Sequence, residues 1–430
     1  MTSTYSNTGS RFKSRPGAVS QHRRVLRRFS RSADSLVREF LPAHEQHADK
    51  AVRAPLVAPT PRHALVLHVF VLLLFSAQTA TTFAADALPE PRARDHRRVM
   101  YFVDDNGRER PVKSRTDWER RRRDVITGAE AAMGRLPDRS ALGLVRFEVV
   151  EGSRTETEKF TREKLKIDVG EGDPVPAWLM IPKGIKRRVP GVIALHQTNG
   201  KLGKDEVAGL AGSTNLHYGM ELAARGYVVI APDYPTLGEY AFDFEKDRYA
   251  SGSMKGIWNH MRCVDFLRER ADVDPRRIGA IGHSLGGHNA MFLGTFDPRV
   301  KCIVSSCGWT PFHDYYGGNL KGWSGERYLP RIRDLYGLDP NRVPWDYYEM
   351  VSAFAPRGFF SCSPVGDSNF DVAGVRKVMS VAGEVYKLHR SPERLQVRYP
   401  NSAHDFPPQV REESYRFLDA TLKHKQSGKR

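Results

Sequence analysis

The sequence predicts an α/β protein built on a mainly parallel, twisted sheet with helices on both faces. Two observations predict this class. From Val189 onward, short continuous apolar runs alternate with amphipathic stretches, which is the order of strand and helix that a covered parallel sheet requires. A serine flanked by glycines, in the run 282–286 (GHSLG), stands where one apolar run ends and a helical stretch begins.

The chain has 430 residues and a net charge of +17, with 40% hydrophobic and 10% aromatic residues. This composition is globular and excludes wholesale disorder and a membrane protein with many spans. Residues 1–63 hold 12 Lys and Arg against 4 Asp and Glu, and they are expected to form a basic, disordered leader. Since about half of the surplus charge lies in this leader, no nucleic-acid partner is expected.

Residues 64–84 have the build of a secretory signal peptide, with a basic flank, a short apolar run and small residues that end at Ala84. We therefore expect cleavage near Ala84 and export to the periplasm or the medium. Two explanations account for a signal so far from Met1. Either the true translation start lies downstream of Met1, or residues 1–63 are a cytoplasmic extension of an uncleaved signal anchor. That anchor would be the one expected contact with a membrane.

Residues 85–140 predict a helical extension, and residues 141–425 predict one α/β domain. Alternating apolar and polar positions predict antiparallel first strands. These strands are expected at Val145–Glu151, Lys159–Val169 and Pro176–Pro182. Buried parallel strands are expected at Gly191–His196, Tyr227–Asp233, Arg277–Ser284, Val300–Ser306, Arg357–Pro364 and Arg394–Pro400. Helices are expected at Asp117–Gly134, Asn215–Arg225, Met254–Glu269, Leu285–Thr295, Gly374–Leu388 and Glu412–Leu422.

An insertion at about 308–349, here called the lid, is rich in aromatic residues. Its rings are expected either to line the substrate or to pack the lid onto the body, and the sequence leaves both readings open. The candidate lining residues are Trp309, Tyr315, Tyr316 and Trp323.

Ser284 is the predicted nucleophile. A serine at a tight strand-to-helix turn needs small neighbours two residues away on each side, and Gly282 and Gly286 supply them. The following helix would direct its N-terminal N–H groups toward a developing oxyanion. The alternative is a glycine-rich packing turn without a catalytic role.

A serine nucleophile needs a base that is oriented by an acid, each in a loop after a later strand. His404, after the last predicted strand, is the predicted base. Asp367 is the preferred acid, with Asp371 as the alternative, although Asp371 is better placed to cap a helix that begins near Val372.

The backbone N–H groups of Leu285 and Thr198 are the predicted oxyanion donors, with Gln197 as the alternative to Thr198. The four cysteines are expected to be buried free thiols, and Cys307 with Cys362 is the one disulfide considered. His283 and His288 lack carboxylates at ligand spacing, so neither a metal nor a cofactor is expected.

The segments LHQTNG, GYVVIAPDYPTLGE, IGHSLGGHNAMF, GDSNFDVAGV and NSAHDFPP resemble α/β-hydrolases of the dienelactone-hydrolase and acetyl-xylan-esterase-like type. The resemblance covers about 164–422 and implies the α/β-hydrolase fold. It also implies hydrolysis of a small-molecule or carbohydrate ester.

The expected activity is therefore that of an exported serine hydrolase that cleaves carboxylic esters through an acyl-enzyme. One alternative is a peptidase of the prolyl-oligopeptidase type, although roughly 100 residues before the sheet are too few for the β-propeller of those enzymes. The other alternative is a non-catalytic binding protein on a hydrolase scaffold.

Overall fold

The computed structural model of the protein describes residues 90–170, 172–247 and 249–425. The expectations for the leader and the signal peptide, residues 1–84, lie outside these ranges. Among the described residues, no helix is both long enough and apolar enough to cross a bilayer.

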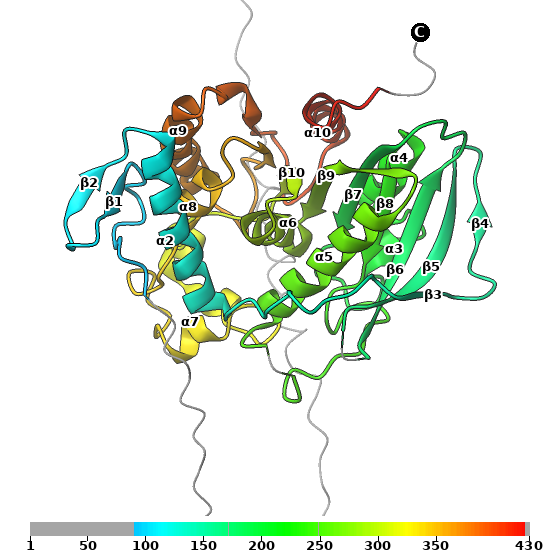
Figure 1. The fold of residues 1–430 in the computed structure, drawn as a ribbon, viewed down its shortest axis with the longest axis horizontal. Helices are drawn as coiled ribbons and strands as arrows, with labels where there is room; N and C mark the ends of the chain where they lie inside the picture. Colours follow the sequence, from blue (N-terminus) through cyan, green and yellow to red (C-terminus); the bar gives the residue numbers. More distant parts are fainter. Residues whose placement is uncertain (1–89, 171, 248, 426–430) are drawn as a thin grey trace, which may run out of the picture. The chain divides into compact units, whose positions relative to one another are not determined.

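A ten-stranded mixed sheet forms the centre of the described chain (Figure 1). Its strand order is β12-β11-β10-β9-β7-β8-β6-β5-β3, and β4 pairs with β5 at its edge. Strands β7 to β12 pair in parallel, and β6, β5 and β3 extend the sheet antiparallel. The predicted class is thus confirmed. The strands are β3 (Phe147–Val149), β4 (Thr155–Glu156), β5 (Phe160–Asp168), β6 (Pro174–Pro182), β7 (Val189–Leu195), β8 (Val228–Pro232), β9 (Val273–His283), β10 (Val300–Ser306), β11 (Gly358–Cys362) and β12 (Leu395–Arg398).

Both faces of the parallel strands are buried, as β7 illustrates. Ile193 and Leu195 belong to one apolar cluster, whereas Val192 and Ala194 belong to the other. Because side chains alternate along a strand, this division buries one set on each face. Helices α5, α6 and α9 contribute to the first cluster, and α4 and α10 contribute to the second. The helices are α3 (Lys204–Val207), α4 (Tyr218–Ala224), α5 (Gly252–Glu269), α6 (Leu285–Phe296), α9 (Val372–Leu388) and α10 (Pro408–Thr421).

The N-terminal segment, residues 90–140, packs against the lid. It holds a hairpin of two strands and helix α2, and α7 and α8 lie in or just after the lid. The fit between the two parts is close, because a Cβ on Gly128 would lie 2.1 Å from the carbonyl oxygen of Pro344. These elements are β1 (Tyr101–Val103), β2 (Glu109–Pro111), α2 (Arg115–Met133), α7 (Arg331–Asp334) and α8 (Tyr347–Ser352).

A buried polar cluster joins the N-terminal segment to the lid. The Arg121 guanidinium donates to Glu349, and both side chains are at most 1% exposed. His96 Nδ1 lies 2.9 Å from the same carboxylate. Asp346 is the N-cap of α8 and accepts the Phe312 N–H at 3.1 Å. Burial raises the pKa of Asp346 to about 7, because the ionised carboxylate loses its hydration there.

The Asp346 carboxyl should make stability depend on pH. Its folded-state pKa is above the ordinary value of 3.8, so its stabilising contribution is complete below that value and is lost as the pH rises through about 7. The melting temperature should therefore fall between about pH 5 and about pH 8, and it should fall less in Asp346→Asn. Asparagine keeps an acceptor oxygen for the Phe312 N–H but does not titrate. The same pH profile in both proteins would contradict this assignment.

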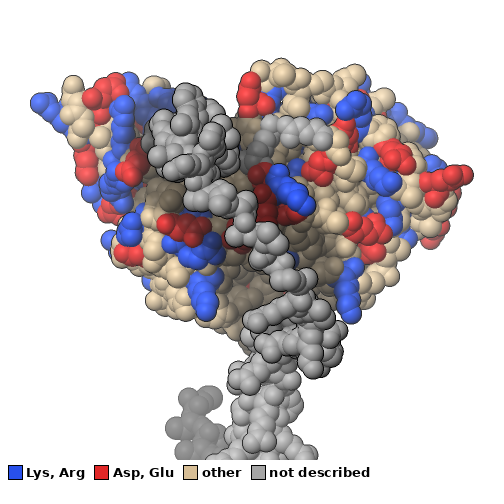
Figure 2. Space-filling model, turned by 90° about the horizontal axis from the view of Figure 1, so that it is seen from below, with Lys and Arg blue, Asp and Glu red and all other residues tan. Residues whose placement is uncertain are grey.

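All four cysteines, Cys263, Cys302, Cys307 and Cys362, are free thiols and buried. The considered pair between Cys307 and Cys362 is therefore wrong, and the expectation of buried free thiols is confirmed. On the described part of the face drawn in Figure 2, Lys and Arg are interspersed with Asp and Glu.

Candidate active site

Ser284 lies in the sharp turn between β9 and α6, with φ 54° and ψ −119°. This is a strained backbone conformation for a residue with a side chain. The turn is also crowded, because a Cβ on Gly282 would lie 2.1 Å from Gly286 O, and a Cβ on Gly286 would lie 1.9 Å from Leu195 O. The Ser284 N–H donates to Ser306 O at 2.8 Å, which ties the turn to the end of β10. The half-buried serine is thereby held at the carboxyl edge of the sheet.

Gly286→Ala should cost at least about 3 kcal/mol of folding stability, because its methyl group would collide with backbone that cannot rotate away. Gly383 in α9 offers a matched control, since a Cβ there meets nothing within 4 Å. Gly383→Ala should instead stabilise by about 0.5–1 kcal/mol through helix propensity. Urea unfolding of the two variants measures both effects. A loss of similar size in both would contradict the crowding.

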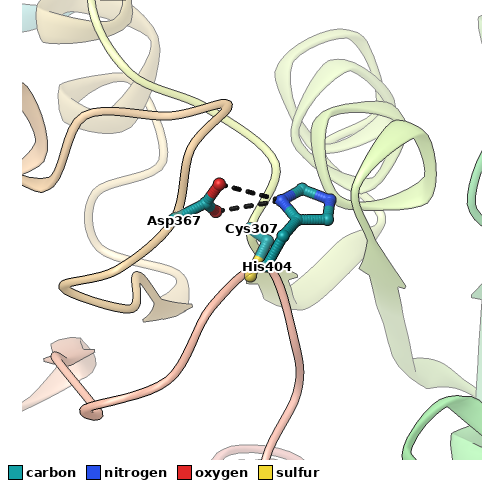
Figure 3. Close-up of side chains that lie close together, drawn as sticks. All are labelled: Cys307, Asp367 and His404. Carbon is teal, nitrogen blue, oxygen red and sulfur yellow. Dashed lines mark hydrogen bonds and ion pairs between the residues drawn. The ribbon is translucent and has the colours of Figure 1, made fainter. Parts of the chain in front are cut away.

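His404 and Asp367 form a hydrogen-bonded pair after β12 and β11. His404 Nδ1 lies 2.9 Å and 3.0 Å from the two carboxylate oxygens of Asp367 (Figure 3). The Asp367 side chain is 1% exposed and that of His404 is 21% exposed, so the acid is buried while the imidazole reaches solvent. Burial opposes ionisation of Asp367, but its hydrogen bonds to His404, Asn369 and Phe370 outweigh burial and lower its pKa.

Backbone hydrogen bonds fix the two loops that carry this pair. The Val365 N–H donates to Pro400 O at 3.0 Å, and the Gly366 N–H donates to Ser402 O at 3.1 Å. Gly366 is needed at this approach, because a Cβ there would lie 2.9 Å from the same Ser402 oxygen. Backbone hydrogen bonds between the two loops therefore hold Asp367 and His404 in position relative to each other.

The base lies beside the serine turn. The ring centroids of His404 and His283, the residue before Ser284, are 4.9 Å apart. In the described part of the chain no hydrogen bond joins Ser284 Oγ to His404, and such bonds often shorten only when substrate binds. Burial lowers the pKa of His283 to about 3, so its imidazole is neutral, and its Nδ1 lies 3.0 Å from Ser306 Oγ.

The loop after β7 faces the start of α6, as Gly286 and Leu195 show by their close approach. Leu285 begins α6 and is 2% exposed, and Thr198 is exposed in the facing loop. Thr198 Oγ1 lies 3.2 Å from the hydroxyl of Tyr328, which belongs to the lid. The Tyr328 ring also packs against the small cluster that contains Leu285. The two predicted oxyanion donors are thus neighbours of the same lid tyrosine.

An ion-pair network centred on the buried Lys204 lies directly after this loop. Lys204 is completely buried, and its ammonium donates to Asp233 at 2.7 Å and to Glu239 at 2.9 Å. The Lys204 N–H also donates to Asp233. Sequence reasoning missed this network, because its members lie on separate loops and no motif joins them. It ties α3, which follows this loop, to the residue after β8.

Of the four candidate lining residues, two are buried in the lid and two reach solvent. Trp309 is 1% exposed, donates its Nε1 hydrogen to Ser361 and stacks on Tyr347, which matches the packing reading. Trp323 is 3% exposed, with its ring centroid 4.8 Å from that of His288. Tyr315 is half-buried, and Tyr316 is 56% exposed. The last two are the ones that present surface to solvent.

Phe370 is a site residue that sequence reasoning missed. Its ring stacks on His404 with centroids 6.1 Å apart, and Tyr315 lies 5.9 Å from it on the lid side. Its position three residues after Asp367 in the acid loop could have indicated it. Asp371, the alternative acid, accepts the Ala373 N–H and is the N-cap of α9. The structure therefore places Asp367, not Asp371, against His404.

Several known proteins are similar to this chain. A sequence model of the Prolyl oligopeptidase family (Peptidase_S9) matches residues 215–364, a stretch that contains Ser284 and ends before Asp367 and His404. YtaP of Bacillus subtilis (strain 168), which its name assigns to the hydrolases, is 26% identical over 301 residues, covering 67% of this chain and 96% of YtaP. Carbohydrate esterase MZ0003, from an unknown prokaryotic organism, is 25% identical over 337 residues, covering 64% of this chain and 75% of the relative.

The solved structures share the fold. A glucuronoyl esterase from Solibacter usitatus matches with a TM-score of 0.58 at 19% identity, covering 76% of this chain and 98% of that one. The chain therefore has the fold of the α/β-hydrolases.

Proposed function

We propose that the protein is a serine hydrolase that cleaves carboxylic esters on carbohydrates through an acyl-enzyme. The observation that carries the proposal is the Asp367–His404 pair beside a strained serine turn. The acid, the base and the nucleophile come from the ends of three strands of one sheet, β11, β12 and β9. That arrangement is the one in which a serine, a histidine and an aspartate act together.

In the proposed mechanism, Ser284 Oγ attacks the ester carbonyl and His404 Nε2 takes its proton. Asp367 accepts the Nδ1 hydrogen, which leaves Nε2 free to act as the base and stabilises the imidazolium that forms. The N–H groups of Leu285 and Thr198 bind the oxyanion. His404 then protonates the leaving alcohol, and water, activated by the same imidazole, releases the acid and restores Ser284.

The carbohydrate part of the proposal is supported by the names of similar proteins and by the site itself. Relatives and structural neighbours include a carbohydrate esterase, a glucuronoyl esterase and 4-O-methyl-glucuronoyl methylesterase 1 of Wolfiporia cocos. At the site, the Phe370 ring stacks on His404, and Tyr315 and then Tyr316 extend this row of aromatic rings toward solvent. Aromatic faces pack well against the apolar face of a sugar ring.

A panel of three substrates tests the proposal. Acetylated xylan fragments and methyl esters of glucuronic acid represent carbohydrate esters, and a p-nitroanilide of a short peptide represents amides. We expect turnover of at least one carbohydrate ester and a kcat/KM for the amide that is lower by orders of magnitude. Faster amide turnover would overturn the ester assignment. Binding of the fragments without any turnover would instead favour a non-catalytic binding protein.

A peptidase of the prolyl-oligopeptidase type is the second candidate, because that family's sequence model matches residues 215–364. Against it, the described residues before β5 form a hairpin, helix α2 and short edge strands, with no propeller among them.

Export is part of the proposal and depends on residues 64–84. N-terminal sequencing of protein recovered outside the cytoplasm should find a start near Ala85. Recovery of intact residues before Ala64 on exported protein would contradict cleavage.

A further inference from the structure

Cys307 is a nucleophilic side chain at the site that the proposed mechanism does not use. Its Sγ, a carboxylate oxygen of Asp367 and a ring nitrogen of His404 all lie within 4.8 Å of one another (Figure 3). The three residues follow β10, β11 and β12, so no spacing in the sequence indicates the cluster. The question is what a thiol does beside a catalytic acid and base.

The position of the Cys307 thiol is fixed by its surroundings. The residue has φ 49°, an uncommon backbone conformation away from glycine, and its N–H donates to Cys362 O at 2.9 Å. Its Sγ contacts Asp405 O at 3.2 Å, and the residue is 2% exposed. The thiol is therefore held against the loop after β12, and the partly exposed imidazole of His404 forms the side of the cluster toward solvent.

We propose that Cys307, Asp367 and His404 form an inhibitory binding site for a thiophilic divalent cation such as Zn²⁺. A thiolate, an imidazole nitrogen and a carboxylate oxygen are the ligands that zinc prefers, and a water molecule would complete a tetrahedron. Zinc bonds of about 2.0–2.3 Å place ligand atoms roughly 3.3–3.8 Å apart. Side-chain movements of about 1 Å would bring the present atoms to those separations.

Zinc binds cysteine as the thiolate. Binding of the cation must therefore release the thiol proton to solvent, as the metal replaces it on sulfur. Hard cations such as Mg²⁺ gain little from sulfur and are reluctant to lose water, so they should not compete for this site.

A bound cation should inhibit ester hydrolysis because it changes the tautomer of His404. This step rests on the proposed function. In the resting pair, Nδ1 carries the hydrogen that Asp367 accepts, and Nε2 is free to take the serine proton. A cation on Nδ1 displaces that hydrogen, and the neutral imidazole then carries its one proton on Nε2. An imidazole in this state cannot accept a proton from Ser284. The cation also removes Asp367 from its role as acceptor.

The binding experiment uses Co²⁺, which replaces zinc and absorbs light, with the full chain carrying Ser284→Ala. This background makes the readout independent of turnover, so it holds even if the ester assignment fails. We expect a sulfur-to-cobalt charge-transfer band that saturates with Co²⁺ and is displaced by Zn²⁺. The band should be lost in Cys307→Ala and retained in Cys362→Ala, which removes a buried thiol from the adjacent strand.

The activity experiment measures inhibition by Zn²⁺ in the presence of Ser284, relative to each variant's own zinc-free rate. Cys307→Ala should raise the half-inhibitory zinc concentration by at least about tenfold, since even indirect partners of a metal change affinity by about 10–100-fold. Mg²⁺ should not inhibit, and EDTA should restore the rate. If Cys307→Ala melts early, Cys307→Ser, which keeps the side-chain size, is used in its place.

No sulfur-to-cobalt band in the Ser284→Ala protein would overturn the proposal. A band that survives the substitution of Cys307, or equal zinc inhibition with and without this thiol, would also overturn it.

Discussion

Replacing Ser284 by alanine is expected to lower ester turnover by about 10⁶-fold, because the acyl-enzyme can no longer form and the triad acts as one unit. The melting temperature should change little, since alanine can hold the same turn with one atom fewer. The rate of p-nitrophenyl acetate hydrolysis measures the loss, with a continuous assay for the active enzyme and long stopped incubations for the variant. A residual rate from oxyanion stabilisation and binding would remain above that of water.

Ser368→Ala is the matched control, because Ser368 is an exposed serine in the loop that carries the acid. It should keep its rate within about twofold, as is usual for surface changes away from special features. If Ser284→Ala retained a tenth of the activity or more, Ser284 would not be the nucleophile.

Replacing Asp367 by asparagine is expected to lower kcat by about 10⁴-fold with the fold intact. The new amide can donate a hydrogen to Nδ1 of His404, which stabilises the tautomer with the proton on Nε2. That tautomer cannot accept the Ser284 proton. The loss should therefore be in kcat more than in KM, and ester hydrolysis at saturating substrate measures it.

Asp371→Asn provides the control for the same chemical change four residues away. Asparagine is as good an N-cap as aspartate, so α9 should keep its start and activity should stay within about twofold. A larger loss at Asp371 than at Asp367 would reverse the assignment of the acid.

The serine turn could be predicted from the sequence because all of its determinants are local. The two glycines, the preceding apolar run and the following helix lie within one short stretch around Ser284. His404 and Asp367 could also be predicted, since each directly follows a strand with a clear apolar run. Helix α5 and strand β10 lie within two residues of their expected bounds for the same reason.

The rest of the site depends on contacts between distant segments. Tyr328 contacts Thr198 although the two are 130 residues apart in the sequence, and Arg121 contacts Glu349 at a separation of 228 residues. No periodicity encodes such pairs, so the lid's packing could not be separated from substrate lining at Trp309. Two local signals were nevertheless present and unused. Asn106-Gly107 favours the β1–β2 hairpin, and Asp346 with Glu349 forms the capping box that begins α8.

Solvent-facing side chains of the lid should be replaceable at little cost to the folded state. Arg121 and Glu349 secure the lid from its buried side, so the side chains that face solvent carry little of its stability. Tyr316 is one such side chain, since it is exposed and adds a hydrogen bond only to the acid loop. If such positions contact substrate, as proposed, they can change while the junction with the N-terminal segment keeps the lid folded.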